Sequence, residues 1–119
     1  MYRVIVAGSR DFHDYGFLLN KLDWALSNRE ASGITIVSGG AKGVDALGER
    51  YAKDYGLSIE RYPADWSTHG KAAGPIRNRQ MAENADALAA FWDGKSRGTK
   101  NMIEEARKKG LRVIIFNTR

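Results

Sequence analysis

The chain has 119 residues, of which 43% are hydrophobic and 28% charged, and its formal net charge is +5 at pH 7. This length and composition are those of one globular domain with a single core, and no apolar run approaches the roughly 20 residues that cross a bilayer. With no cysteine and only two histidines, the chain offers neither a disulfide frame nor a thiolate metal site. We therefore expect one cytoplasmic domain over 1–119 with no membrane segment, no metal and no other cofactor.

Five apolar runs mark the expected strands, at 2–8, 34–39, 58–63, 87–94 and 112–118. The first, second and last are nearly continuous and rich in β-branched residues, which predicts strands buried on both faces of a parallel sheet. The run at 58–63 alternates and predicts an edge strand. The first run is too short to be a signal peptide and begins almost at the initiator, so it is better interpreted as a strand.

Helical patterns lie between these runs. Leu18, Leu22 and Leu26 share one stripe. A helix is expected over about 74–85, with Pro75 in its first turn, and another over about 99–109. The alternation of strands and helices predicts an α/β fold, in which a mostly parallel five-stranded sheet is flanked by helices.

In such a sheet, ligands bind beyond the carboxyl ends of the strands, near the point where the strand order reverses. The loops at those ends are 8–15, 38–45, 63–79 and 93–99. Eight of the nineteen lysines and arginines lie in these loops or directly after them, which favours an anionic partner: Arg10, Lys42, Lys71, Arg77, Arg79, Lys95, Arg97 and Lys100.

Two glycine-rich turns are candidates for phosphate binding. "SGGAKGVD" (38–45) follows the second run and "DGKSRGT" (93–99) follows the fourth, and each leads into an expected helix. Backbone N–H groups at a helix N-terminus attract anions, and glycines allow a phosphate to come close. The alternative is that these glycines only turn the chain. The first turn is neither a dinucleotide fingerprint nor a P-loop.

Polar and aromatic side chains of the loops supply further candidates, each with a structural alternative. Asp45 and Asp93 either bind a sugar hydroxyl or cap a helix, and Arg10 either binds phosphate or forms a surface salt bridge. Trp66 either stacks on a base or makes a core or dimer contact. The predicted ligand-binding residues are Gly8, Ser9, Arg10, Ser38, Gly39, Gly40, Ala41, Gly43, Asp45, Arg77, Asn78, Asp93, Gly94, Ser96, Gly98 and Thr99.

The motifs "GSRDF", "SGGAKGVD", "PADW", "GPIRNRQM" and "FWDGKSRGT" resemble, in this order and spacing, the YspA-like branch of the SLOG superfamily. That superfamily includes the Lonely Guy phosphoribohydrolases and the DNA-processing protein A. The resemblance covers nearly the whole chain. It implies a Rossmann-like fold with a site for a nucleotide or a nucleotide-derived ligand, such as a nucleoside monophosphate, ADP-ribose or an NAD derivative.

The resemblance to the Lonely Guy enzymes also implies catalytic positions. Their catalytic arginine falls on Arg77, but the glutamate that ends their second glycine motif falls on Met102. Asp45 or Asp93 is the candidate for a replacement carboxylate, because departure of a base from ribose needs an anion near the sugar. The catalytic residues expected of an enzyme are therefore Arg77, Asp45 and Asp93.

Three functions remain open on the sequence. The preferred one is a small-molecule binding module that senses or sequesters a nucleotide. The second is a hydrolase that cleaves the N-glycosidic bond of such a ligand, and the third is nucleic-acid binding, favoured by the net charge and by Trp66. The resemblance is also compatible with a homodimer.

Overall fold

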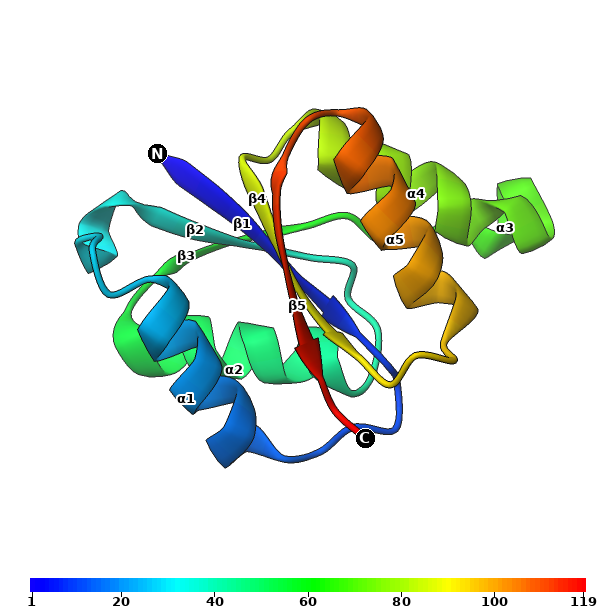
Figure 1. The fold of residues 1–119 in the computed structure, drawn as a ribbon. Coiled ribbons are helices and arrows are strands. Elements are labelled where there is room, and N and C mark those ends of the chain that lie inside the picture. Colours follow the sequence, from blue (N-terminus) through cyan, green and yellow to red (C-terminus); the bar gives the residue numbers. More distant parts are fainter.

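The computed structural model describes all residues 1–119 and shows five strands in one parallel sheet, with helices on both faces (Figure 1). None of the helices combines the length and the apolar character needed to cross a bilayer. The strands are β1 (Tyr2–Gly8), β2 (Ile34–Ser38), β3 (Ser58–Arg61), β4 (Ala87–Trp92) and β5 (Arg112–Asn117). The helices are α1 (Tyr15–Ala25), α2 (Val44–Tyr55), α3 (Trp66–His69), α4 (Ala73–Glu83) and α5 (Arg97–Lys108), with 3-10 turns at Ala31–Gly33 and Gly70–Ala72.

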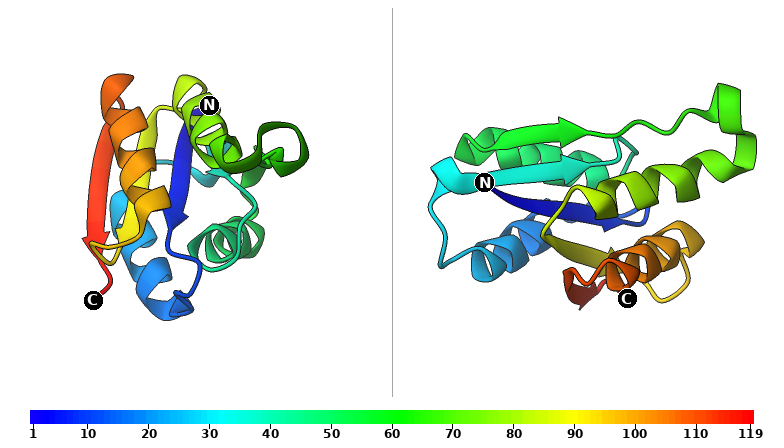
Figure 2. Two further views of the ribbon diagram at one scale, coloured as in Figure 1. Left: turned by 90° about the vertical axis from the view of Figure 1, so that its right-hand side faces the viewer. Right: turned by 90° about the horizontal axis from the view of Figure 1, so that it is seen from above.

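The two faces of the sheet carry separate cores, because successive strand residues point to opposite sides. Val4 and Val6 of β1 pack with α1 and α2 on one face, whereas Ile5 and Ala7 pack with α4 and α5 on the other. Figure 2 shows these two helical layers edge-on. The expected stripe on α1 is buried here, and Leu22 is fully enclosed, which contributes about 1.5–3 kcal/mol.

The strand order is β3-β2-β1-β4-β5. The chain moves outward from β1 to β3 and then returns to the other side of β1 as β4, so the order reverses between β1 and β4. The chain leaves β1 toward α1 on one face and leaves β4 toward α5 on the opposite face. These diverging connections leave room for a ligand between the two carboxyl ends. The α/β fold class expected from the alternation of runs is confirmed.

The burial of the strands confirms two predictions and corrects a third. All five residues of β2 are buried, and β3 is an edge strand as predicted. The prediction that the last run is buried on both faces is wrong, since β5 pairs with β4 alone and Ile115 is 39% exposed. Its β-branched composition indicates a strand but does not reveal whether a second neighbour covers its outer edge.

Candidate functional site

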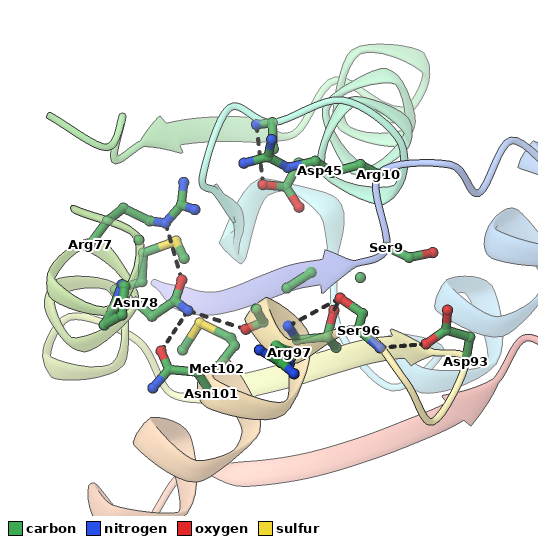
Figure 3. Close-up of a pocket in the computed structure, with 18 of the residues that line it drawn as sticks. Ser9, Arg10, Asp45, Arg77, Asn78, Asp93, Ser96, Arg97, Asn101 and Met102 are labelled. Carbon is green, nitrogen blue, oxygen red and sulfur yellow. Dashed lines mark hydrogen bonds between the residues drawn. The ribbon is translucent and has the colours of Figure 1, made fainter. Parts of the chain in front are cut away.

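A cleft of about 820 Å³ lies at the carboxyl edge of the sheet, between the ends of β1 and β4 and the helices α4 and α5. This volume is within the range of about 300–1,000 Å³ found for small-molecule sites. Figure 3 looks into it: Arg77 and Asn78 approach from α4, Asp45 lies near the start of α2, and Asp93 and Ser96 lie on the loop after β4. We call it the switch-point cleft.

Eleven of the sixteen predicted ligand-binding residues line the switch-point cleft, and they come from four separate segments of the chain. All three residues expected of an enzyme are among them. Whether any of them contacts a ligand stays a prediction. The eleven are Gly8, Ser9, Arg10, Ala41, Asp45, Arg77, Asn78, Asp93, Ser96, Gly98 and Thr99.

Three amides of the first glycine turn and the start of α2 are occupied by internal hydrogen bonds. The N–H of Gly40 donates to Ser38 Oγ at 3.0 Å, and the N–H of Ala41 donates to Asp45 Oδ2 at 3.2 Å. At the start of α2, the N–H of Val44 donates to a backbone carbonyl of the loop after β1. These amides are therefore already partnered within the protein. The predicted residues that do not line the cleft are Ser38, Gly39, Gly40, Gly43 and Gly94.

Two glycines of this turn are required by close packing. Gly43 has a φ of +74°, and a Cβ there would clash with the carbonyl of Ser9. A Cβ on Gly39 would clash with the guanidinium of Arg77 and would lie 2.8 Å from Asp45 Oδ2. The first turn thus brings Arg77 and Asp45 near one another beside the cleft.

The second glycine turn leaves backbone donors free. Helix α5 begins at Arg97, two residues earlier than expected, and Ser96 is its N-cap, accepting the N–H of Thr99. The first N–H groups of a helix have no partner within the helix, and those of Arg97 and Gly98 have no other acceptor in the protein. Both residues line the cleft. The N-terminus of a 12-residue helix therefore presents two free donors and partial positive charge to the cleft.

Asp93 shapes the loop that precedes α5. Its Oδ1 accepts the N–H groups of Lys95 and Ser96, both at 2.8 Å, and these bonds hold the pKa of the carboxyl below its usual range. The alternative that Asp93 caps helix α5 is wrong, because Ser96 is the N-cap. Asp93 instead fixes the turn that precedes the helix.

Four cations line the switch-point cleft: Arg10, Arg77, Lys95 and Arg97. None of them takes part in an ion pair, although the molecule contains five ion pairs elsewhere. The alternative that Arg10 forms a surface salt bridge is therefore wrong. The other four basic residues expected at this edge do not line the cleft, namely Lys42, Lys71, Arg79 and Lys100.

Hydrogen bonds link α4 to the first glycine turn and to α5. Arg77 Nη1 donates to the carbonyl of Gly39 at 2.6 Å, and its Nε donates to Asn78 Oδ1 at 3.1 Å. Asn78 Nδ2 donates to Asn101 Oδ1 at 2.9 Å and to the carbonyl of Gly98 at 3.3 Å. Sequence reasoning missed Asn101, although its position three residues after Gly98 places it on the same face of α5.

Asp45 is a nearly buried carboxylate, 6% exposed, on the wall of the cleft. Burial raises its pKa, and this effect exceeds the opposing influence of the hydrogen bond from Ala41 and of the nearby charges of Arg77 and Arg10. Its Oδ2 accepts the N–H of Ala41, which precedes α2, so it does not cap the helix in the usual way. Its other oxygen has no partner in the protein and is not enclosed.

The position of the Lonely Guy glutamate is apolar in this structure. Met102 is 1% exposed, belongs to the core under α5 and also lines the cleft. Glu104 and Glu105 follow it on α5, but neither lines the cleft. The carboxylates that do so are Asp11, Asp45 and Asp93. No group of three histidine, aspartate or glutamate side chains is placed to hold a metal ion.

A second cavity of about 420 Å³ lies at the amino ends of the strands, next to the end of α1. Its lining is mostly apolar and includes Tyr2, Trp24, Ile114 and Arg29. The guanidinium of Arg29 lies 3.3 Å from the centre of the Tyr2 ring. It offers no free helix N-terminus, and it lies at the opposite ends of β1 and β4 from the switch-point cleft.

Sequence comparison identifies the family. A model of the YspA, cpYpsA-related SLOG family matches residues 2–69, more than half of the chain. The Gene 61 protein of Mycobacterium phage D29 is 38% identical over 122 residues, covering 98% of this chain and 97% of that protein. The chain belongs to the YspA-related SLOG family. The resemblance expected from the five motifs is thereby confirmed, and the match to the phage protein extends it over α4 and α5.

Solved structures similar to this SLOG chain include the DNA processing protein A of Streptococcus pneumoniae (TM-score 0.74, 20% identity, 96% of this chain and 49% of that one). The DNA processing protein A of Helicobacter pylori, described for its single-stranded DNA binding mode, gives a TM-score of 0.70 at 22% identity, over 99% of this chain and 66% of that one. The structure of TM1055 gives a TM-score of 0.69 at 21% identity, over 95% of this chain and 72% of that one. The SLOG chain thus spans about half to two thirds of the DNA processing proteins, and at these identities the likeness shows the fold alone.

Proposed function

We propose that this SLOG protein binds a nucleotide or a nucleotide-derived small molecule in the switch-point cleft, as a sensor or sequestering module. One observation carries the proposal: Arg97 and Gly98, whose amides have no acceptor, line the same cleft as four cations that have no ion-pair partner. An excess of positive charge at a helix N-terminus is the usual setting for a phosphate group.

The cleft also offers a contact for a sugar. The free oxygen of Asp45 is an acceptor on the wall opposite α5, and a ribose hydroxyl is a suitable donor to it. Phosphate at α5 and ribose near Asp45 would use two chemically different walls of one cleft. A nucleotide carries both groups, whereas inorganic phosphate uses only one of these contacts.

Hydrolysis of the ligand is the second candidate, because Asp45 and Asp93 have pKa shifts of opposite direction within one cleft. A carboxyl with a raised pKa can donate a proton to a departing base, and an ionised carboxylate can stabilise a cationic sugar. Two features oppose this role. Met102 supplies no charge at the position of the glutamate, and the guanidinium of Arg77 is already engaged by Gly39 and Asn78.

Nucleic-acid binding is the third candidate, favoured by the net charge of +5 and by the similarity to a protein described for its single-stranded DNA binding mode. A strand held through phosphates releases counterions, so its affinity would fall steeply as salt is added. Affinity for a mononucleotide that makes few phosphate contacts depends less on salt.

Native mass spectrometry with a nucleotide panel tests these functions directly. The panel contains nucleoside monophosphates, ADP-ribose, NAD and a single-stranded oligothymidine, and each mixture is followed over time. We expect one intact nucleotide per protein chain. Release of free base would show hydrolysis, retention of the oligothymidine alone would show nucleic-acid binding, and no retained ligand would contradict all three functions.

A charge-matched pair of variants tests the location. Replacing Lys95 and Arg97 by alanine removes two cations from the cleft, and replacing Arg107 and Lys108 removes two from the far end of the same helix. We expect the first variant to lose at least ten-fold in affinity and the second to change little. Equal losses would place the ligand elsewhere.

A further inference from the structure

Residues 65–72 form an arm at the edge of the switch-point cleft, and all eight are exposed. Figure 2 shows α3 extending beyond the body of the sheet at the start of α4. The arm keeps its shape through local bonds, since Asp65 Oδ1 accepts from Ser67 Oγ at 2.8 Å and from the N–H of Thr68 at 3.1 Å. It is therefore an ordered projection that buries little apolar surface of its own.

The arm places Trp66 at the cleft with half of its surface in water. Its exposure is 51%, so the alternative that it makes a core contact is wrong. An exposed indole forgoes much of the burial free energy that large aromatic side chains supply. The ring lies over the first turn of α4, where a Cβ on Gly74 would be 3.5 Å from Trp66 Cη2. Gly74, which lies beneath the indole, thus has no side chain.

The lining of the cleft is divided by chemistry. The larger apolar side chains come from the arm, α4 and the buried face of α5, namely Trp66, Pro75, Met81 and Met102. Charged groups come mainly from the loops after β1 and β4 and from the start of α5. A ligand that satisfies both parts has a flat apolar portion as well as an anionic one. Inorganic phosphate and sugar phosphates lack the first.

We propose that Trp66 stacks on the nucleobase of a ligand whose phosphate lies at the N-terminus of α5. This inference rests on the proposed function and names the part of the ligand that is selected: a nucleobase joined to phosphate is bound in preference to a base-free sugar phosphate. Stacking of a base on an aromatic side chain is largely independent of base identity, so Trp66 selects for a base rather than for one base.

Calorimetric titration of the wild type and three variants tests the inference. Trp66→Ala removes the ring, Trp66→Phe retains one, and Trp24→Ala is a matched control, because Trp24 is 67% exposed and lines the second cavity. The probes are the nucleoside monophosphates, ADP-ribose, ribose 5-phosphate and a single-stranded oligothymidine. Since Trp66 is exposed, its replacement leaves the fold intact, which circular dichroism checks.

We expect Trp66→Ala to weaken the best nucleotide by about 5- to 150-fold, the range found when a base-stacking residue is replaced by alanine. Trp66→Phe should retain most of the affinity, and Trp24→Ala should retain all of it. Affinity for ribose 5-phosphate, whether measurable or absent in the wild type, should be the same in Trp66→Ala.

The failures are distinguishable. If the wild type binds a nucleotide and Trp66→Ala binds it equally well, the stacking role is overturned and the proposed function stands. Equal weakening of ribose 5-phosphate binding would show that Trp66 only shapes the cleft, and this result would also overturn the stacking role. Binding of none of the probes contradicts both proposals. If only the oligothymidine binds and depends on Trp66, stacking is upheld and the small-molecule function fails.

Discussion

Replacing Gly98 by aspartate should move stability and binding in opposite directions. Gly98 is the second residue of α5 and lines the cleft. Its φ is negative, and a Cβ there would meet no atom within 4 Å. Gly40 in the first glycine turn is unsuited to the same test, because its φ of +74° strains any side chain. A carboxylate at Gly98 is therefore tolerated by the fold but stands where we place the phosphate.

The magnitudes follow from two elementary interactions. An acidic side chain in the first turn of a helix stabilises it by about 0.3–1 kcal/mol, and leaving glycine for a residue with better helix propensity adds a few tenths. This corresponds to a rise in Tm of about 1–5 °C for a chain of this size. Two like charges about 4 Å apart near a protein surface repel by about 4 kcal/mol, which is close to a thousand-fold in affinity before screening by salt.

Scanning calorimetry and titration calorimetry measure the two effects on the same samples, with Gly98→Asn as a neutral control of similar size. We expect Gly98→Asp to melt slightly above the wild type and to bind its best nucleotide at least thirty-fold more weakly. Gly98→Asn should lose less than about three-fold. If Gly98→Asp keeps full affinity while its Tm rises, the phosphate is not at the start of α5 and the reasoning fails.

Two further variants probe the wall opposite α5. Arg77→Ala removes charged hydrogen bonds to Gly39 and Asn78. We therefore expect a loss of about 1.5–3 kcal/mol in the free energy of unfolding, measured with urea, together with weaker nucleotide binding. A variant as stable as the wild type would contradict the role of these hydrogen bonds. Asp45→Asn should gain stability relative to the wild type as the pH rises from about 4 to about 7. The folded pKa of Asp45 is raised, so above the ordinary value of 3.8 the unfolded chain ionises more readily and the wild type loses stability, whereas asparagine does not titrate. Urea melts at both pH values check this, and a gain that is the same at both would contradict it.

The sequence predicts the fold well because its signals are local and repeated. The apolar runs end within two residues of the strands. The alternation of strands and helices places the carboxyl ends of the parallel strands at one edge of the sheet, but the strand order that brings β4 beside β1 comes from the structure. The exposed character of β5 could not be predicted, since its composition matches that of the buried strands. Burial at an edge depends on which elements pack against it, and that information is not local.

The site was predicted at the level of loops but not of individual bonds. Both glycine turns look alike in sequence, yet Ser38 and Asp45 accept the amides of Gly40 and Ala41 in the first, while those of Arg97 and Gly98 at the end of the second have no acceptor. Which acceptors reach an amide depends on the packing of α2 against β1. The short helix α3 lies in what the sequence shows only as a long loop, because its four residues are too few for a helical period.

The most direct test of the central claim is to map a nucleotide onto the backbone amides by nuclear magnetic resonance, to which a chain of 119 residues is well suited. We expect the largest shifts at Arg97 and Gly98, with smaller ones along the loop after β1 and around Asn78. Shifts confined to the second cavity near Trp24, or no shifts with any nucleotide of the panel, would contradict the assignment of the switch-point cleft.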